Sequence, residues 1–423
     1  MIRAILAVAG GAMLLSTATA AAGVDKRAVL SHYADIAQAG YEDSLIAARG
    51  LQERIDALLA APSAATLDAA RKAWIAARVP YMQTEAFRFG NAIVDDWEGK
   101  VNAWPLDEGL IDYVDTSYGN SSDENPGYTA NVIAEVSLRF GAEVIDATTI
   151  SRELLADVLQ ELGGVEANVA TGYHAIEFLL WGQDLNGTGP GAGDRPWTDF
   201  ASGEACSNGN CDRRAAYLKT ATALLIDDLD WMTAQWAAGG AARRELTDGD
   251  HDNGLAVILT GLGSLSYGEL AGERIKLGLM LHDPEEEHDC FSDNTHNSHY
   301  FDTVGIANVY TGSYTRIDGR RLFGPAIRDL VAETAPALND EMLSKLAATV
   351  AAAGAMKQRA ETVEAYDQMI GADNPEGNAA VQATVDALTA QTKTLERIVA
   401  TLKLRPIAFE GSDSLDKPEA VFQ

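Results

Sequence analysis

The chain has 423 residues, with 62 acidic against 32 basic side chains and a formal net charge of −30 at pH 7. This balance excludes the basic surface that nucleic-acid binding requires, and it favours a soluble protein that weakly attracts cations. The length exceeds what one ordinary hydrophobic core supports, so two domains or one large repeat are expected.

The first twenty residues have the pattern of a secretory signal peptide. Arg3 precedes an apolar run from Ala4 to Leu15, and residues 18–20, Ala-Thr-Ala, form a small-residue cleavage site. We therefore expect an exported protein. No other stretch is long and apolar enough to cross a bilayer, so the sequence predicts no transmembrane span.

Helical periodicity runs through most of the remaining chain. Apolar residues recur at three- and four-residue spacing in the segments 25–61, 67–89, 152–162, 165–181, 213–238, 255–281 and 324–404. Pro80 lies inside the second segment and is expected to kink or break it. Strand alternation of useful length is absent from the sequence, so the predicted fold is all-α. We expect two helical-bundle domains, 25–200 and 213–404, arising from a duplicated bundle and followed by a loose tail at 405–423.

The segment 165–181, VEANVATGYHAIEFLLW, contains the most informative pair of side chains. On a helix His174 and Glu177 lie three residues apart and point the same way, beside a stripe of large apolar residues. Such a pair can hold one cation or share one proton, and the alternative is a partly buried ion pair that only orients the helix. Gly172 is a poor helix former, which suggests that another backbone or a ligand comes close.

Two other segments contain candidate ligands. Glu85 and Arg88 lie three apart in an aromatic run, where a surface ion pair is the plain alternative to a functional role. The polar stretch 283–312 is dense in histidine and aspartate, and it could supply metal ligands or form solvated turns. Asp293 and His296 are its candidate donors.

The three cysteines have different expected roles. Cys206 and Cys211 are separated by four residues in a turn-rich loop, and an oxidising compartment favours a local disulfide between them. Cys290 is left over and is expected to be a buried free thiol.

Several motifs together resemble the imelysin family, also known as peptidase family M75, which includes iron-regulated protein A. The resemblance is carried by GYHAIEFLLWG with its G-x-H-x-x-E core, by AWIAARVPYMQTEAFRFG, by VNAWPLDEGLIDYV and by EEHDCFSDNTH with GIANVYTGSY. It extends from about Tyr33 to Leu404. It implies two α-helical bundle domains with the motif near their interface, and an exported bacterial protein of iron or other metal uptake. Such a protein would be periplasmic, or peripheral to the outer membrane or cell surface.

The resemblance also implies a set of site residues. The metal ligands would be His174 and Glu177, with Glu85 and Asp293 as further donors. A wider ligand-binding set would add four residues: Gly172, Arg88, Ser292 and His296.

Three functions follow from these residues. The first is binding of a metal ion, such as iron, zinc or manganese, or of a small ligand, with other envelope proteins of metal uptake as partners. The second is a non-catalytic scaffold in which His174 and Glu177 brace the interface. The third is a metallopeptidase with Glu177 as its catalytic residue. However, Phe178 stands where the inverted zinc motif requires a second histidine, so we rank proteolysis last.

Overall fold

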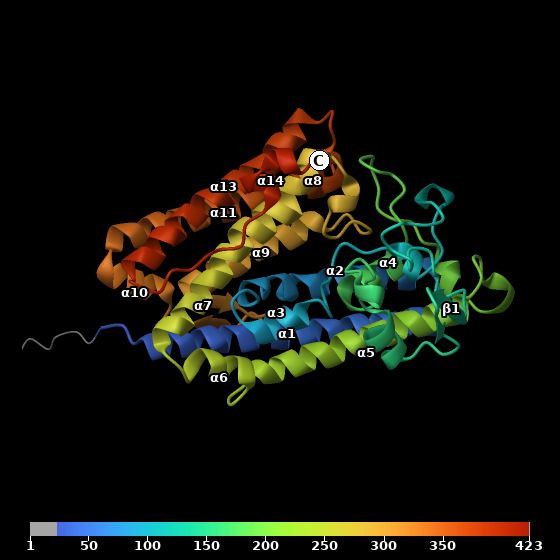
Figure 1. The fold of residues 1–423 in the computed structure, drawn as a ribbon, viewed down its shortest axis with the longest axis horizontal. Helices are drawn as coiled ribbons and strands as arrows, with labels where there is room; N and C mark the ends of the chain where they lie inside the picture. Colours follow the sequence, from blue (N-terminus) through green and yellow to red (C-terminus); the bar gives the residue numbers. More distant parts are fainter. Residues whose placement is uncertain (1–22, 423) are drawn as a thin grey trace, which may run out of the picture.

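The protein is described here by a computed structural model of residues 23–422, and the predicted signal peptide lies outside the described residues. The fold is all-α, as the sequence predicted. Its helices form two groups, one around the long helices α1 and α5 and one around α9, α11 and α13 (Figure 1). Whether the two groups descend from a duplicated bundle stays a prediction.

The first group is built on α1 (Lys26–Ala60), which is one continuous helix. Asp25 begins it by accepting a hydrogen bond from the Arg27 backbone, and Leu51, Ile55 and Leu58 are among its buried residues. It packs against α2 (Ala64–Met82) and α5 (Cys211–Trp236), and short helices complete the group: α3 (Ala92–Glu98), α4 (Gly172–Trp181) and α6 (Ala241–Thr247). The break expected near Pro80 falls just after it, where α2 ends and a 3₁₀ turn (Glu85–Phe87) follows.

The second group is built around one long apolar segment, His251–Leu281. It consists of α7 (His251–Ser264), a π-helical stretch η8 (Leu265–Lys276) and α8 (Leu277–Leu281). Within residues 23–422 this is the one helix whose length and composition would allow a membrane span, and 78% of its apolar window is buried in the fold, as in a core helix. Two helices of the group pack against it, α9 (Thr295–Thr311) and α13 (Pro375–Thr401). The other helices pack on these two: α10 (Ile327–Thr334), α11 (Pro336–Thr362) and α12 (Tyr366–Ile370).

The expectation of a loose tail after residue 404 is wrong. This segment runs back along the apolar helix and contains α14 (Asp413–Asp416). Gly263 and Gly272 leave no room for a Cβ because Phe409 and Ser412 pack against them. Ser414 also donates a hydrogen bond to the Gly272 carbonyl at 3.0 Å.

Short irregular elements lie between the helices of each group. Two antiparallel hairpins, absent from the prediction, pair β1 (Ser137–Phe140) with β2 (Glu143–Asp146) and β3 (Ser313–Thr315) with β4 (Arg321–Phe323). The helix expected over 152–162 is a π-helical stretch, η4 (Leu154–Leu159). The remaining short turns are Glu108–Leu110, Thr116–Tyr118, Leu162–Gly164, Trp197–Phe200, Gly203–Ala205, Pro284–Glu286 and Pro418–Ala420.

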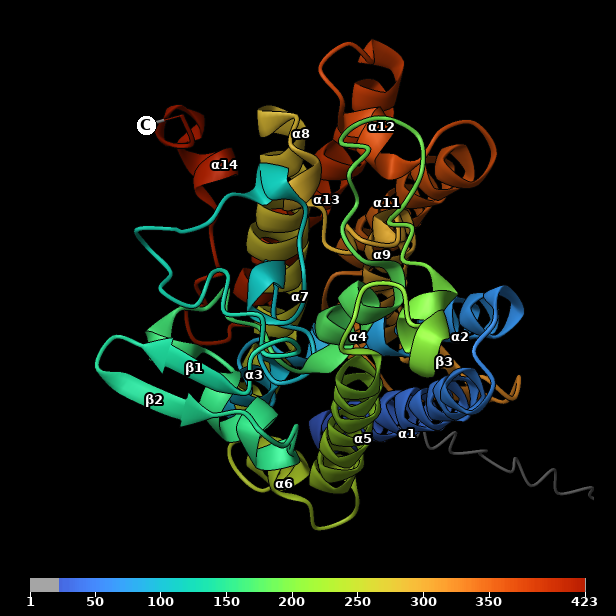
Figure 2. The same ribbon diagram turned by 90° about the vertical axis from the view of Figure 1, so that its right-hand side faces the viewer.

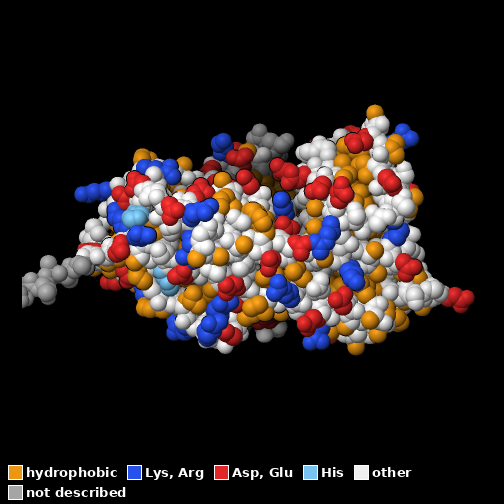
Figure 3. Space-filling view, turned by 90° about the horizontal axis from the view of Figure 1, so that it is seen from below, with side chains coloured by type: hydrophobic (Ala, Val, Ile, Leu, Met, Phe, Trp, Pro, Cys, Tyr) orange, Lys and Arg blue, Asp and Glu red, His pale blue; other side chains and the backbone are white. Residues whose placement is uncertain are grey.

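The surface and the cysteines agree with an acidic protein that has one local crosslink. Acidic side chains are interspersed with basic and apolar ones on the face in Figure 3, without a continuous basic patch there. Cys206 and Cys211 form the predicted disulfide at the start of α5, with Cα atoms 6.1 Å apart. Cys290 is free and half-buried.

The helix that carries the His/Glu pair is shorter than predicted. Residues 165–171 are not helical, and α4 begins at Gly172, whose φ is +80°. A Cβ on Gly172 would collide with the Val101 carbonyl, and the next residue, Tyr173, donates its backbone N–H to that same oxygen at 2.7 Å. The close backbone approach expected at Gly172 is therefore confirmed.

Replacing Gly172 with alanine should destabilise the protein, because the new Cβ meets the Val101 carbonyl and the backbone is left-handed. We expect a loss of about 1–3 kcal/mol in the free energy of unfolding, measured by urea denaturation. Gly50→Ala is the matched control, since its Cβ meets nothing within 4 Å inside α1. That change should be neutral or stabilising by up to about 1 kcal/mol. Equal effects of the two substitutions would contradict this account of α4.

Candidate metal centre

Helix α4, which carries the His/Glu pair, is buried and packs against α2 and α5 (Figure 2). His174 is 1% exposed and Glu177 is fully buried. The His174 Nδ1 and Glu177 Oε2 atoms are 3.0 Å apart. Ser292 donates both its backbone N–H and its hydroxyl to Glu177 Oε1, at 3.0 and 2.6 Å. Both carboxylate oxygens of Glu177 are thus engaged, whereas Nε2 of His174 has no hydrogen-bond partner among residues 23–422.

The loop before α9 brings a second imidazole and a carboxylate to His174. The rings of His174 and His288 are 4.8 Å apart between centroids. Ligand atoms of His174, His288 and Asp289 all lie within 4.8 Å of one another, and all three residues are buried. Within residues 23–422, this is the one group of three His, Cys, Asp or Glu residues close enough to hold a metal ion.

A buried arginine of α2 balances the charge of this group. Arg78 donates to Asp289 Oδ1 at 2.8 Å and to His288 Nδ1 at 3.3 Å, and its guanidinium lies 5.1 Å from the ring centre of Tyr173. The other carboxylate oxygen, Asp289 Oδ2, accepts hydrogen bonds from two side chains of α9 and its N-cap, Ser298 and Asn294, at 2.6 and 2.7 Å. Asp289 is therefore held rigidly, with its charge already paired.

Burial and Arg78 set the protonation of the group. Burial, followed by the nearby Arg78, lowers the pKa of His174 to about 3, and burial with Arg274 lowers the pKa of His288 well below its usual range. Both imidazoles are thus neutral at pH 7, which is the form that binds metals. Burial alone would raise the pKa of Asp289, but Arg78 and the hydrogen bonds from Ser298 and Asn294 together outweigh it and keep the carboxylate ionised.

Glu177 is under opposing influences. Burial and the charge of Asp289 raise its pKa, while the two hydrogen bonds from Ser292 favour the ionised form. In either form it holds the Nδ1 side of His174 and directs the unpartnered Nε2 away from itself.

Glu85 and Arg88 belong to a neighbouring ion-pair network. Arg274 contacts Glu85 and Glu269 at 2.7 Å and Asp302 at 3.3 Å. Arg88 contacts Asp95 at 2.9 Å, Glu269 at 3.3 Å and Glu98 at 3.5 Å. The structure does not bring Glu85 into the His174 group.

A cavity of about 510 Å³ connects this network to the His174 group. Arg274 and His288 line it, together with seven carboxylates from several segments: Asp95, Asp96, Glu98, Glu161, Glu166, Glu269 and Glu273. Seven carboxylates against two arginines, Arg88 and Arg274, make the cavity acidic, and His288 forms part of its wall.

Asp293 and His296 lie beyond the loop and outside the group. Asp293 has a left-handed backbone with φ of +54°, and its Oδ1 has no partner. Burial and the nearby Asp367 raise its pKa to about 8. The Nδ1 atom of His296 is also without a partner, and burial lowers the pKa of His296 to about 4. Of the residues expected from the sequence, His174, Glu177 and Ser292 come together directly.

Arg78 was not among the expected residues of the site, and His288 and Asp289 were expected only as members of the polar stretch 283–312. Arg78 could have been found, because it shares a helical face with Trp74 and Tyr81, and a charge on an apolar stripe requires a buried partner. His288 and Asp289 lie in an irregular stretch, where spacing along the chain carries no information about facing direction.

Together, the fold and the site define an all-α protein with a buried group of two imidazoles and a carboxylate. The imelysin family model, peptidase M75, matches residues 37–395. The chain therefore belongs to the imelysin family.

Solved structures agree with this fold. An iron-regulated protein A precursor from Parabacteroides distasonis ATCC 8503 aligns with a TM-score of 0.64 at 18% identity, covering 91% of this chain and 97% of that one. An imelysin-like protein from Psychrobacter arcticum 273-4 gives a TM-score of 0.55 at 17% identity, covering 92% and 100%. In sequence, iron-regulated protein A of Synechococcus elongatus is 36% identical over 81 residues, which are 19% of this chain and 23% of that protein.

His299 provides a test of the buried histidines. It is fully buried against Tyr366, and neither ring nitrogen has a hydrogen-bond partner in the described part of the chain. Burial lowers its pKa to about 3. The unfolded chain takes up this proton near pH 6.5. The contribution of neutral His299 to the free energy of unfolding is therefore fully present above pH 6.5, and it is lost as the pH falls towards 3. From pH 7 to pH 5 the loss from His299 is about 2 kcal/mol.

The variant His299→Phe should lack this loss. We expect its free energy of unfolding, relative to wild type, to improve by about 2 kcal/mol between pH 7 and pH 5 in chelator-treated samples. Chemical denaturation at the two pH values measures this. A difference between variant and wild type that does not change with pH would refute the neutral, buried state of His299.

Proposed function

We propose that this protein binds one metal ion between His174, His288 and Asp289, and that it serves iron or other metal uptake outside the cytoplasm. The observation that carries the proposal is the unpartnered Nε2 of His174 in a group whose ligand atoms lie within 4.8 Å. Two imidazoles and one carboxylate form a mixed nitrogen and oxygen donor set that suits iron, zinc or manganese. The acidic cavity whose wall includes His288 supports a path for cations.

Glu177 would not bind the metal itself but would hydrogen-bond His174, one of its ligands. Metal-binding histidines usually donate their second N–H to a carboxylate, which fixes the ring orientation and raises the basicity of the bound nitrogen. The 3.0 Å contact between His174 Nδ1 and Glu177 Oε2 has this form. Ser292 in turn holds Glu177 in position.

Arg78 would tune the affinity for the ion. Without a cation, its guanidinium pairs with Asp289, both side chains being at most 1% exposed. A bound cation would have to share that carboxylate with Arg78. The site would therefore release the bound metal ion more readily than a site without the arginine. Such release suits a protein that transfers metal to a partner.

The assignment to iron rests on relatives. The imelysin family membership and the partial match to iron-regulated protein A support a role connected with iron. The predicted signal peptide supports export, and envelope proteins of metal uptake would be the partners.

The peptidase alternative has weaker support. Glu177, the base that it would need, has both oxygens engaged by His174 and Ser292. We therefore rank binding ahead of proteolysis.

Calorimetric titration of the chelator-treated protein with Zn²⁺, and with Fe²⁺ without oxygen, tests the site. Wild type should bind one ion. Glu177→Gln should weaken binding by about 10- to 100-fold through loss of the outer carboxylate, and His174→Ala should weaken it further. His251→Ala, a histidine at the start of α7 outside the group, is the control and should bind as wild type. Unchanged affinity in His174→Ala would refute the proposed centre.

Arg78→Gln should lower the stability of the metal-free protein and raise its affinity for the metal ion. Removing the guanidinium leaves Asp289 charged and buried, so the metal-free protein should lose about 3–5 kcal/mol of stability. The same change should increase the rise in Tm caused by Zn²⁺, because the ion no longer competes with Arg78. Thermal unfolding with and without Zn²⁺ measures both effects. A smaller metal-induced rise than in wild type would show that Arg78 supports the ion instead of competing with it.

A further inference from the structure

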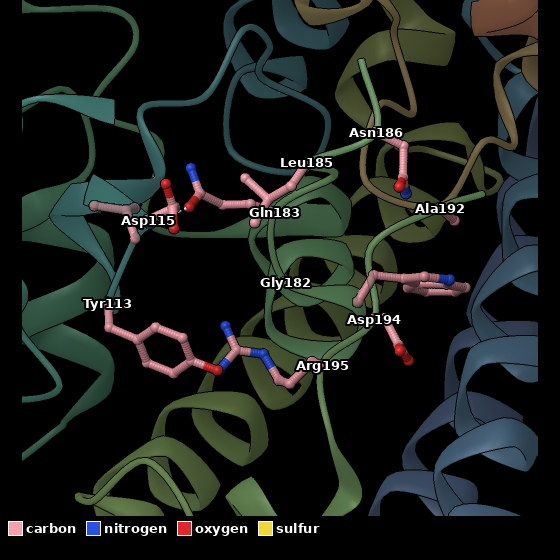
Figure 4. A pocket seen from close by; sticks show the side chains of 11 residues that line it. Tyr113, Asp115, Gly182, Gln183, Leu185, Asn186, Ala192, Asp194 and Arg195 are labelled. Atoms are coloured by element: carbon pink, nitrogen blue, oxygen red, sulfur yellow. Dashed lines mark hydrogen bonds between the residues drawn. The ribbon is translucent and has the colours of Figure 1, made fainter. Parts of the chain in front are cut away.

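A second pocket lies at the opposite end of α4 from the His/Glu pair. It has a volume of about 370 Å³, and Figure 4 shows the Arg195 side chain extending into it towards Tyr113. Trp181, Gly182 and Leu185 line it at the end of α4 and in the loop that follows. Eight residues of helix separate His174 from Gly182, about 12 Å along the axis, so this pocket is distinct from the metal centre.

Arg195 is fixed in this pocket on one side only. Its Nη1 donates to Asp112 Oδ2 at 2.7 Å and to Asp199 Oδ2 at 3.0 Å. Its guanidinium lies between two aromatic rings, 5.0 Å from the centre of Tyr113 and 5.3 Å from that of Phe178. These contacts hold the guanidinium plane rigidly, and the whole residue is only 3% exposed.

The other edge of the same guanidinium has no partner. Neither Nε nor Nη2 of Arg195 makes a hydrogen bond in the described part of the chain, although both atoms are buried. A buried donor without a partner costs about 1–3 kcal/mol, so a protein retains one where a ligand or solvent completes it. The Nε and Nη2 hydrogens point in parallel, which is the geometry that both oxygens of a carboxylate accept.

The surroundings favour an acceptor with a single negative charge. On the Nη1 side, Arg195 pairs with Asp112 and Asp199, and Arg214 pairs with Asp112. Two guanidinium groups therefore face two carboxylates, and those charges balance. Gly182 lies beside the free edge with φ of +73°, and a Cβ there would be 3.7 Å from Nε, so its absence leaves space. Asp115 and Asp194 also line the pocket and disfavour anions with two or three charges.

We propose that this pocket binds a small organic monocarboxylate, whose two oxygens accept the Nε and Nη2 hydrogens of Arg195. The apolar part of the ligand would lie against Trp181, Leu185 and Ala192. A small movement of the covering loop, residues 183–194, would admit the carboxylate to the buried edge. The site does not depend on the metal centre.

The probe is phenylacetate, titrated calorimetrically into the full chelator-treated chain. Its uncharged analogue phenylacetamide and inorganic phosphate are compared with it. Phenylacetate should bind with one-to-one stoichiometry, and the amide and phosphate should bind about tenfold more weakly or not at all. Binding should be unchanged in His174→Ala, which excludes the metal centre as the place of binding.

Variants locate the contact. Arg195→Lys retains a positive charge for Asp112 and Asp199 but loses the two-donor edge, so affinity should fall about tenfold or more. Leu185 is 64% exposed at the pocket. Leu185→Glu should weaken phenylacetate binding by charge repulsion, whereas its neutral match Leu185→Gln should bind as wild type.

Four results would overturn the proposal. The first is the absence of saturable phenylacetate binding, and the second is equal binding of phenylacetamide. The third is tighter binding of phosphate than of phenylacetate, and the fourth is full phenylacetate affinity in a folded Arg195→Lys variant. Thermal unfolding of each variant establishes that it is folded, and the Leu185 pair decides the question if Arg195→Lys is not.

Discussion

The salt bridge between Arg78 and Asp289 is the interaction on which the arrangement of the site depends. It joins α2 to the loop before α9, with side chains 1% and 0% exposed. Burying two charges is costly, and their attraction offsets the cost only with good geometry and further hydrogen bonds. Asn102, Asn294 and Ser298 supply those bonds. Because both charges must be satisfied together, the loop has one position, and that position puts His288 beside His174.

The same logic explains why Glu177 is engaged at both oxygens. A carboxylate in the interior needs donors, and Ser292 and His174 provide them. The loop that carries Ser292 also carries His288 and Asp289, so one segment completes the imidazole pair and fixes the carboxylate behind it. The α4 helix contributes the other half of the centre from a start that only a glycine at position 172 permits.

Much of this could be predicted from the sequence where helical periodicity operates. The shared direction of His174 and Glu177 followed from their spacing, and their side chains do meet at 3.0 Å. The beginning of α4 was placed seven residues too early, because apolar residues before Gly172 continue the helical pattern although they lie in an irregular segment with a turn. Glu85 has a helical spacing to Arg88, yet its partner is Arg274, 189 residues away. Local spacing records which residues share a face, and it carries no information on which distant segment that face meets. His288 and Asp289 were not singled out within the polar stretch for this reason, since they lie in a loop without a period.

The return of residues 405–422 along the apolar segment His251–Leu281 has a consequence for the handling of the protein. Residues 405–422 pack over a row of glycines on a helix whose length and apolar composition would allow it to span a lipid bilayer. Proteolytic removal of about the last twenty residues would expose the apolar face of this helix to solvent. The shortened protein would then self-associate or adsorb to vesicles, although the cut removes none of the residues of the His174 group.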